Sequence, residues 1–324
     1  MPDQITYTEH AQDVLEKAHE LISRGDHFAL ITSVDIKGGT ARELGSLALV
    51  TALGDMFGYL SNGCIDQDIR LNALRCLAKK ERKIVHYGEG SPFPDLTLPC
   101  GGKLKVLIDP EPDRQVLMAA LDDLVARRPA RLIFHTSQAA QTLEVEYRPK
   151  PKVTLAGRGA VFRATTKLAQ LAGFDVSCIS PDEDDATALK DACGLTVHPL
   201  LSPASAIDLS LDQWSAFLTL FHDHSWEPAL LQRAVQTPCR FIGALGSQKT
   251  HEARKAVLLA MGCEPADVER IHGPVGLVPS LRSADLIAVA VTAELAAAVS
   301  RSQQVVTGQK GSTCQKLVFE PSTG

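Results

Sequence analysis

The sequence predicts an α/β protein in which an N-terminal mixed α+β domain is followed by a Rossmann-like, doubly wound parallel sheet. Two observations indicate the second part: short apolar segments alternate with helical stretches after residue 152, and a glycine-rich turn joins the first segment to a helix. The first part is indicated by β-branched apolar runs around a tight Gly-Asp turn at 54–55. A chain of 324 residues suits two domains, since one domain typically takes roughly 150 residues.

The first half is expected to contain two helices and a small sheet. Thr6 and Glu9 have capping-box spacing, and apolar residues then recur at helical intervals up to Gly25. A second helical pattern covers 64–80, and a proline-rich loop covers 91–102. Five segments have strand-like content: 28–34, 46–53, 56–60, 82–88 and 103–109.

A domain boundary is expected at 147–151, because the two prolines of this segment disfavour helix and stiffen the backbone. We therefore divide the chain into residues 1–149 and 150–324. In the second part the predicted strands are 153–157, 174–180, 195–200, 216–222 and 240–246. The helical stretches lie near 160–172, 183–193, 226–236, 248–261 and 283–300, and a polar tail without strong periodicity follows.

The charge balance and the cysteine usage exclude several classes of protein. Lys and Arg total 33 against 38 Asp and Glu, a net charge of -5, so no overall positive field attracts nucleic acid or anionic lipid. The N-terminus has no basic region before an apolar core, and no apolar run has membrane-spanning length. Eight cysteines without a CxxC pair are typical of a reducing compartment. We therefore expect a cytoplasmic protein that binds neither nucleic acid nor membrane.

The glycine-rich turn in the second half has two interpretations. Gly157 and Gly159 lie between a predicted strand and a helix, where backbone N–H groups and the helix dipole hold phosphates in dinucleotide-binding folds. The motif is incomplete, because Phe162 stands where a third glycine is usual. The next strand ends at Ser180 instead of a ribose-binding carboxylate, and Asp182 lies two residues further on. The alternative is a tight strand-to-helix turn that binds no ligand.

Two cysteines in the first half are candidate thiol ligands. Cys100 follows a proline and precedes Gly101 and Gly102, so a large ligand can approach its loop closely, and its sulfur suits a thiophilic metal. Cys64 follows Gly63 at a predicted helix start, where the helix dipole lowers a thiol pKa and backbone donors receive an anion. In both cases the alternative is a buried, inert cysteine, since free cysteines are commonly buried.

Other polar residues are candidates for ligand contacts in loops. Arg42 offers the planar donors that suit a phosphate or a pterin, although a solvated loop arginine is the alternative. His222 and His224 lie at the end of a predicted central strand, but no third ligand has suitable spacing, so we do not predict a metal there. Three further residues are expected either to line the same carboxyl edge of the sheet or only to form turns: Gly246, Ser247 and Gly276. Asp66 and Asp68 complement a helix N-terminus without a catalytic role.

Eight motifs in fixed order resemble the XdhC/CoxI family over nearly the whole chain. They are GGTAREL (38–44), GYLSNGCIDQDI (58–69), LPCGGKLKVLIDP (98–110), GRG (157–159), LFHDHSWEPALL (220–231), FIGALGSQKT (241–250), HGPVGL (272–277) and SADLIAVAVTAEL (283–295). The chain departs from the family pattern where Gly-Thr-Ala precedes Arg42, where Ile65 separates Cys64 from the acidic Asp66, and where Ala160 follows the second glycine.

The resemblance implies a non-enzymatic accessory protein for molybdenum hydroxylases such as xanthine dehydrogenase and aldehyde oxidoreductase. Such a protein binds the molybdenum cofactor, as molybdopterin or its dinucleotide form, protects it and assists its insertion. The resemblance also implies a molybdenum hydroxylase client, a cysteine desulfurase as sulfur donor, a homodimer, and contact of Cys100 with the molybdenum end. The expected cofactor-binding residues are Arg42, Gly63, Cys64, Cys100, Gly101, Gly102, Gly157, Gly159, Gly246, Ser247 and Gly276.

The alternative function is an NAD(P)-dependent oxidoreductase that uses the second domain for its nucleotide. No acid–base pair with diagnostic spacing accompanies the incomplete glycine turn, so the sequence favours the accessory protein.

Overall fold

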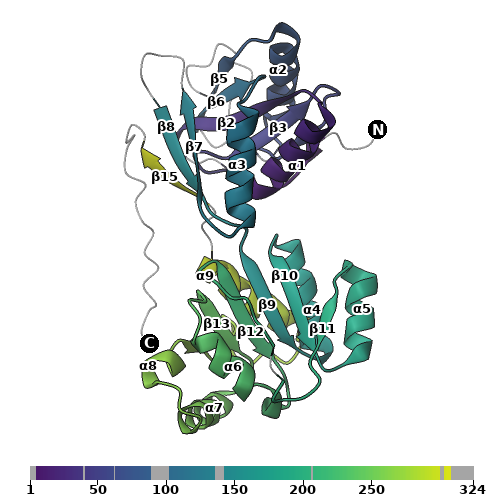
Figure 1. Cartoon of the computed structure of the whole chain (residues 1–324), viewed down its shortest axis with the longest axis vertical. Coiled ribbons are helices and arrows are strands. Elements are labelled where there is room, and N and C mark those ends of the chain that lie inside the picture. The colour runs from purple at the N-terminus through teal and green to yellow at the C-terminus, as the bar shows by residue number, and fades with distance from the viewer. Residues whose placement is uncertain are drawn as a thin grey trace. The chain divides into compact units, whose positions relative to one another are not determined.

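The computed structural model describes residues 5–38, 41–61, 63–88, 102–135, 142–205, 207–299 and 303–307. These residues form two compact units (Figure 1). The first unit contains the described residues up to Asp123, together with Pro129–Tyr147 and the strand at Gln303–Thr307. The second unit contains Leu124–Arg128 and the described residues from Arg148 to Val299. No helix within the described ranges is long and apolar enough to span a membrane.

The first unit is built on a six-stranded sheet with the order β1-β4-β3-β2-β6-β5. The strands are β1 (Ile5–Thr6), β2 (Phe28–Lys37), β3 (Leu47–Thr51), β4 (Met56–Phe57), β5 (Lys83–Tyr87) and β6 (Lys103–Asp109). Strand β2 is antiparallel to β3 and β6, β3 is antiparallel to β4, and β5 is antiparallel to β6. This pairing brings the ends of β2, β4 and β5 and the starts of β3 and β6 to one side of the sheet, which we call the first-unit edge.

Two helices cover this sheet. Helix α2 (Asp66–Lys79) packs Ile69, Ala73 and Cys76 against one face, in a core cluster with residues such as Ile31 and Val50. Helix α1 (Ala11–Arg24) also contacts β3 but contributes no residue to this cluster, which places it on the opposite face. Both faces of β3 are therefore covered, and all five of its residues are buried.

The start of α1 differs from the prediction. The prediction of a capping box at Thr6 and Glu9 is wrong, because Thr6 belongs to β1, where it pairs with Phe57. The residue that caps the helix is His10, whose Nδ1 accepts a hydrogen bond from the Gln12 amide at 3.2 Å. The predicted end at Gly25 is confirmed.

Besides β1, four elements that the sequence patterns do not predict complete the first unit. Helix α3 (Arg114–Val125) precedes a three-stranded antiparallel sheet of β7 (Ala130–His135), β8 (Thr142–Tyr147) and β15 (Gln303–Thr307). Strand β15 comes from the segment expected to be a polar tail of the second domain, and it pairs with β8 instead. The Tyr147 hydroxyl is buried and donates to the Gly45 carbonyl at 2.6 Å, which ties β8 to the loop before β3.

The second unit is a doubly wound parallel sheet, as predicted, with the order β11-β10-β9-β12-β13-β14. The strands are β9 (Lys152–Gly157), β10 (Asp175–Ser180), β11 (Val197–Pro199), β12 (Ser215–Leu220), β13 (Phe241–Ala244) and β14 (Ile271–His272). The helices are α4 (Gly159–Leu171), α5 (Glu183–Cys193), α6 (Pro228–Val235), α7 (Gln248–Ala260), α8 (Pro265–Val268) and α9 (Ala284–Val299), with a 3₁₀ turn at His224–Trp226.

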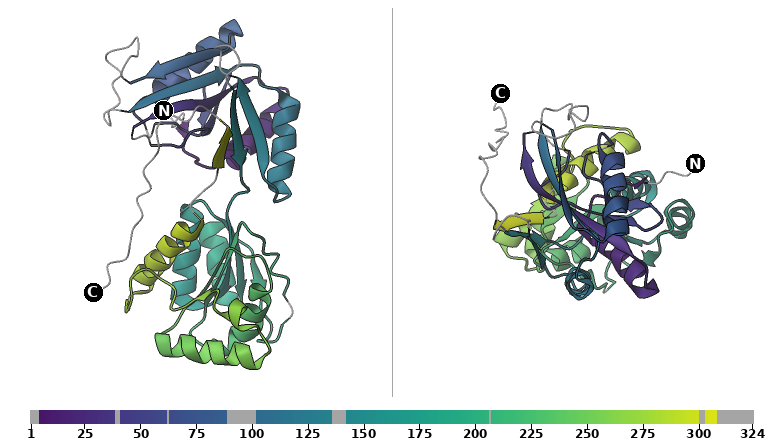
Figure 2. Two further views of the ribbon diagram at one scale, coloured as in Figure 1. Left: turned by 90° about the vertical axis from the view of Figure 1, so that its left-hand side faces the viewer. Right: turned by 90° about the horizontal axis from the view of Figure 1, so that it is seen from above.

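Helices cover both faces of the parallel sheet (Figure 2). One core cluster joins α6 and α7 to one face, and the other joins α4, α5 and α9 to the opposite face. The carboxyl ends of the parallel strands form one side of the sheet, which we call the second-unit edge. The strand order reverses between β9 and β12, and in open α/β sheets this switch point is where ligands usually bind.

Candidate functional site

The first-unit edge brings together those predicted site residues of the first half that the structure describes. Arg42 lies in the connection from β2 to β3, Gly63 and Cys64 lie between β4 and α2, and Gly102 immediately precedes β6. These segments are far apart in the sequence, and antiparallel pairing places them on the same side of the sheet. Cys100–Gly101 lies outside the described residues.

Arg42 contacts an aromatic ring, that of Tyr59, and an acidic residue, Glu9. Its guanidinium lies 4.8 Å from the ring centroid of Tyr59 and donates to the main-chain carbonyl of Glu9. The Arg42 side chain is 10% exposed, whereas the Glu9 side chain, whose carboxylate lies 3.8 Å from Arg42 Nη1, is 74% exposed. Because Glu9 is open to water and its carboxylate lies as far as 3.8 Å from Arg42 Nη1, the attraction between the two charges is weak.

Two tyrosines link Arg42 to the glycine loop. The rings of Tyr7 and Tyr59 lie 5.3 Å apart, and a Cβ atom on Gly63 would lie 3.9 Å from the Tyr7 hydroxyl. The Tyr59 hydroxyl donates to the Glu9 carboxylate. Burial, and then this hydrogen bond, raise the pKa of Tyr59, so the phenol stays a neutral donor. Arg42 and Gly63 therefore belong to one cluster.

Asp66 fixes the loop that precedes Cys64. Its buried carboxylate accepts three main-chain hydrogen bonds, from Leu60 at 2.8 Å, Ser61 at 3.1 Å and Gly63 at 2.7 Å. Asp66 thus does more than complement the helix dipole. It also accepts hydrogen bonds from the backbone N–H groups that we expected to receive an anionic ligand near Cys64. Cys64 is exposed beside this loop, which makes it an accessible thiol.

The remaining residues at this edge have structural roles. Gly102 is buried, and its carbonyl oxygen lies close to Gly88. A Cβ atom on Gly88 would collide with this oxygen, which explains why residue 88 is a glycine. Nearby, the Tyr87 hydroxyl donates to Asp68 Oδ2 at 2.8 Å, and Asn72 donates to the same oxygen at 2.8 Å. Besides its predicted interaction with the helix dipole, Asp68 therefore links α2 to β5 through hydrogen bonds.

At the second-unit edge, the glycine turn is already bound to a carboxylate. Gly157 lies against β12, since a Cβ atom there would approach the Leu220 carbonyl oxygen to 2.9 Å. Gly159 has φ of 79°, and its N–H donates to Asp185 Oδ2 at 2.7 Å. The other carboxylate oxygen of Asp185 accepts from Arg163 Nε. The amide that suits a phosphate therefore has an internal anion as its partner.

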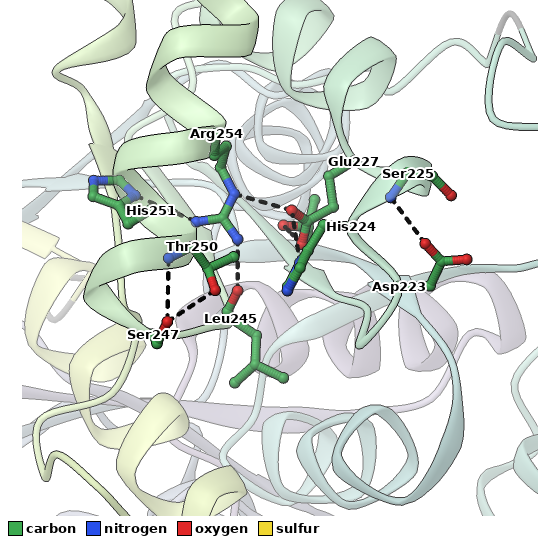
Figure 3. A network of polar contacts seen from close by, with 10 residues as sticks. Asp223, His224, Ser225, Glu227, Leu245, Ser247, Thr250, His251 and Arg254 are labelled. Carbon is green, nitrogen blue, oxygen red and sulfur yellow. Dashed lines mark hydrogen bonds and ion pairs between the residues drawn. The ribbon is translucent and has the colours of Figure 1, made fainter.

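A buried ion pair joins Glu227, at the start of α6, to Arg254 of α7 (Figure 3). The side chains of Glu227 and Arg254 are 1% and 3% exposed, and Arg254 Nε lies 3.0 Å from Glu227 Oε2. Arg254 Nη2 donates to the Leu245 carbonyl at 2.6 Å. His224 Nδ1 lies 3.3 Å from the same oxygen of Glu227. Such pairing allows two charges to be buried together.

His251 lies on the other side of Arg254. Its Nδ1 is 3.3 Å from Arg254 Nη1, and burial, followed by the charge of Arg254, lowers the pKa of His251. His251, Arg254 and Leu258 follow one buried face of α7. An arginine at a core position of an amphipathic helix is the sequence signal that would have indicated a buried acidic partner.

The three other predicted residues of this edge each have internal contacts. Ser247 caps α7, because its Oγ accepts from the Thr250 amide at 3.1 Å. Gly246 lies against the side chain of Thr250, and the Gly276 N–H donates to Glu294 Oε2 at 2.5 Å. Within the described ranges, no three His, Cys, Asp or Glu side chains are placed to hold a metal ion.

Comparisons with known proteins agree with these motifs. Residues 21–88 match the family model "XdhC and CoxI family", and residues 153–295 match "XdhC Rossmann domain". The chain is 30% identical over 309 residues to the molybdenum cofactor insertion chaperone PaoD of Escherichia coli K12, a match that covers 91% of both chains. It is 21% identical over 294 residues to the uncharacterized protein YqeB of the same organism, which covers 87% of this chain and 46% of YqeB.

A solved structure shares the fold. The chain superposes on a Bacillus halodurans protein, described as a xanthine dehydrogenase, with a TM-score of 0.72. The sequences are 18% identical, and the match covers 88% of this chain and 95% of the other. Because similarity to PaoD extends along nearly the whole of both proteins, the chain belongs to the XdhC and CoxI family.

Proposed function

We propose that this protein is a chaperone that binds the molybdenum cofactor and delivers it to a molybdenum hydroxylase of the xanthine dehydrogenase or aldehyde oxidoreductase type. The observation that carries the proposal is the 30% identity to an insertion chaperone over 91% of both chains. Similarity of this extent includes both units and not just the Rossmann fold, which many unrelated functions share. The cofactor, as molybdopterin or its dinucleotide form, is cargo in this proposal.

The first-unit edge is the proposed place of binding. Arg42 offers planar, multiple donors to a phosphate or a pterin, and an anionic cargo would replace the exposed Glu9 as its partner. Cys64 supplies an accessible thiol beside the same cluster. Gly88 and Gly102, which both lie at this edge, bound the segment that contains Cys100, the residue proposed for the molybdenum end. Sulfur is a suitable ligand for such a metal centre.

The geometry does not favour the NAD(P)-dependent oxidoreductase. A dinucleotide in this fold places its pyrophosphate on the amides at the start of the first helix. Here the Gly159 N–H donates to Asp185 at 2.7 Å, so a phosphate would first have to displace a buried carboxylate.

The proposal is tested on full-length protein isolated from a host that makes the cofactor. Molybdenum is measured by mass spectrometry and pterin by fluorescence after oxidation, and transfer is measured as activation of a cofactor-free hydroxylase. We expect cofactor to co-purify and to activate the hydroxylase, and we expect Cys100→Ala to lose most of the bound cofactor. Cys76→Ala, which removes a buried thiol of the same unit, is the matched control. Absence of pterin from the wild-type protein, or full retention by a folded Cys100→Ala variant, would overturn the proposal.

A further inference from the structure

Asp185 binds the amide at the start of α4, the kind of donor on which Rossmann-type units usually hold a phosphate. Its carboxylate is buried and bridges two donors of α4: the Gly159 N–H, at 2.7 Å from Oδ2, and Arg163 Nε, which donates to Oδ1. Asp185 itself belongs to α5, the neighbouring helix on the same face of the sheet (Figure 1). The contact therefore joins two helices that are separated by strand β10.

Capping of helix α5 does not explain why the Asp185 carboxylate is buried. Helix α5 is capped by Asp182, whose Oδ1 accepts from the Asp184 and Asp185 amides at 2.9 and 3.2 Å. Asp184, one position before Asp185, is exposed. Of the acidic residues in the first turn of α5, Asp185 is the buried one, and its side chain points to α4.

A carboxylate and a phosphate use the same features of such a turn. Both are anions that accept hydrogen bonds from the first helix amide and benefit from the positive end of the helix dipole. A guanidinium such as that of Arg163 binds either group well. The two anions cannot share these donors, because like charges at contact distance repel strongly where little water separates them.

We propose that Asp185 is a built-in substitute for a nucleotide phosphate, which closes the Gly157–Gly159 turn to dinucleotides. The specificity of the second unit is then set by this one carboxylate. The end of β10 agrees, since Ser180 stands where a dinucleotide-binding unit usually has the acid that binds a ribose. This inference does not depend on the proposed chaperone function, and it holds for any cargo of the first unit.

The test is binding of ADP and of inorganic phosphate to the full chain, measured by titration calorimetry. The wild-type protein gives the baseline, which includes any phosphate bound by Arg42 at the first-unit edge. Asp185→Ala frees the Gly159 amide and the Arg163 guanidinium, so we expect it to bind ADP at least about tenfold more tightly than this baseline. Asp184→Ala removes the same charge from the same helix turn and should gain nothing. The double variant Asp185→Ala/Arg163→Ala should lose the gain.

The inference is overturned if folded Asp185→Ala binds ADP no better than Asp184→Ala. A second measurement uses the wild-type protein alone and does not require a variant to fold. In an NMR titration, the Gly159 amide resonance should stay unmoved by ADP. A saturable shift of that resonance would show that phosphate reaches the turn, and the inference would fail.

Discussion

The two units share a device, a glycine amide bound by a buried aspartate, but they build it differently. In the first unit Gly63 donates to Asp66 at 2.7 Å, three residues along the chain, and two neighbouring amides donate to the same carboxylate. In the second unit Gly159 donates to Asp185 at 2.7 Å, 26 residues away, and Arg163 completes the contact. The first contact shapes one loop, whereas the second joins two helices.

This difference has consequences for ligand binding. In the first unit the carboxylate fixes a loop, and the exposed Cys64 and the Arg42 cluster lie beside it. In the second unit the carboxylate takes the donors that a phosphate would use. The comparison thus supports the proposal that cargo binds at the first-unit edge, while the glycine turn of the second unit serves internal stabilisation.

Removal of the first aspartate should have the largest effect. Asp66→Ala leaves three buried or half-buried amides without their shared acceptor, so we expect the first unit to lose about 3–5 kcal/mol of unfolding free energy. Hydrogen exchange read by mass spectrometry reports each unit separately. Asp122→Ala, on the exposed face of α3, should change little. A loss below about 1 kcal/mol for Asp66→Ala would show that the loop is held by other contacts.

An exposed thiol of the first unit and a buried thiol in the core of the second should differ in reactivity by roughly 100-fold or more. Burial raises the pKa of Cys178, on β10, to about 11, against about 8.5 for an ordinary thiol. Cys64 is exposed. With iodoacetamide at neutral pH, peptide mass spectrometry should therefore find Cys64 alkylated long before Cys178. Equal rates would contradict the difference in accessibility between Cys64 and Cys178.

Loss of the second aspartate should destabilise the second unit by less, about 2–3 kcal/mol. Asp185→Ala removes the acceptor of Gly159 and Arg163, but the Arg163 side chain is 36% exposed, so water replaces part of the lost interaction. Urea unfolding followed by tryptophan fluorescence reports this unit, because Trp214 and Trp226 both lie in it. Asp184→Ala should match the wild-type protein, and equal losses for the two variants would refute a specific role for Asp185.

The smallest effect concerns pH. The pKa of His251 lies below its ordinary value of about 6.5, because burial and Arg254 disfavour the charged ring. Its contribution to stability is therefore complete above pH 6.5 and is lost as the pH falls below it. Between pH 7 and 5 the wild-type second unit should lose up to about 1 kcal/mol more than His251→Gln. His198→Gln, at an exposed position of this unit, is the control, and it should follow the wild-type curve.

Local patterns predicted most of the framework. Alternating apolar segments and helical stretches gave the parallel sheet, because burial of strands on both faces leaves continuous apolar runs such as that of β12. The capping box failed because Thr6 pairs with Phe57, a contact between distant residues. Strand β7 alternates buried and exposed residues over Ala130–His135, a signal that was available in the sequence.

The partners of the buried carboxylates could not all be predicted from local patterns. Asp66 lies beside the loop that it binds, so its spacing to Gly63 indicates a local contact. Asp185 and Glu227 find their partners across helices, and only the packed fold decides which arginine each one meets. The motifs therefore located both sheet edges, but the structure alone shows that the Gly159 amide and the Arg163 guanidinium already bind Asp185.

The central claim is that cargo binds at the first-unit edge, and matched substitutions test it most directly. Full-length Arg42→Gln and Arg163→Gln are isolated from a cofactor-producing host, and the pterin content per chain is compared with that of the wild-type protein. We predict that Arg42→Gln loses most of the pterin while Arg163→Gln retains it. Full retention by folded Arg42→Gln, together with loss from folded Arg163→Gln, would contradict the claim and place the cargo in the second unit.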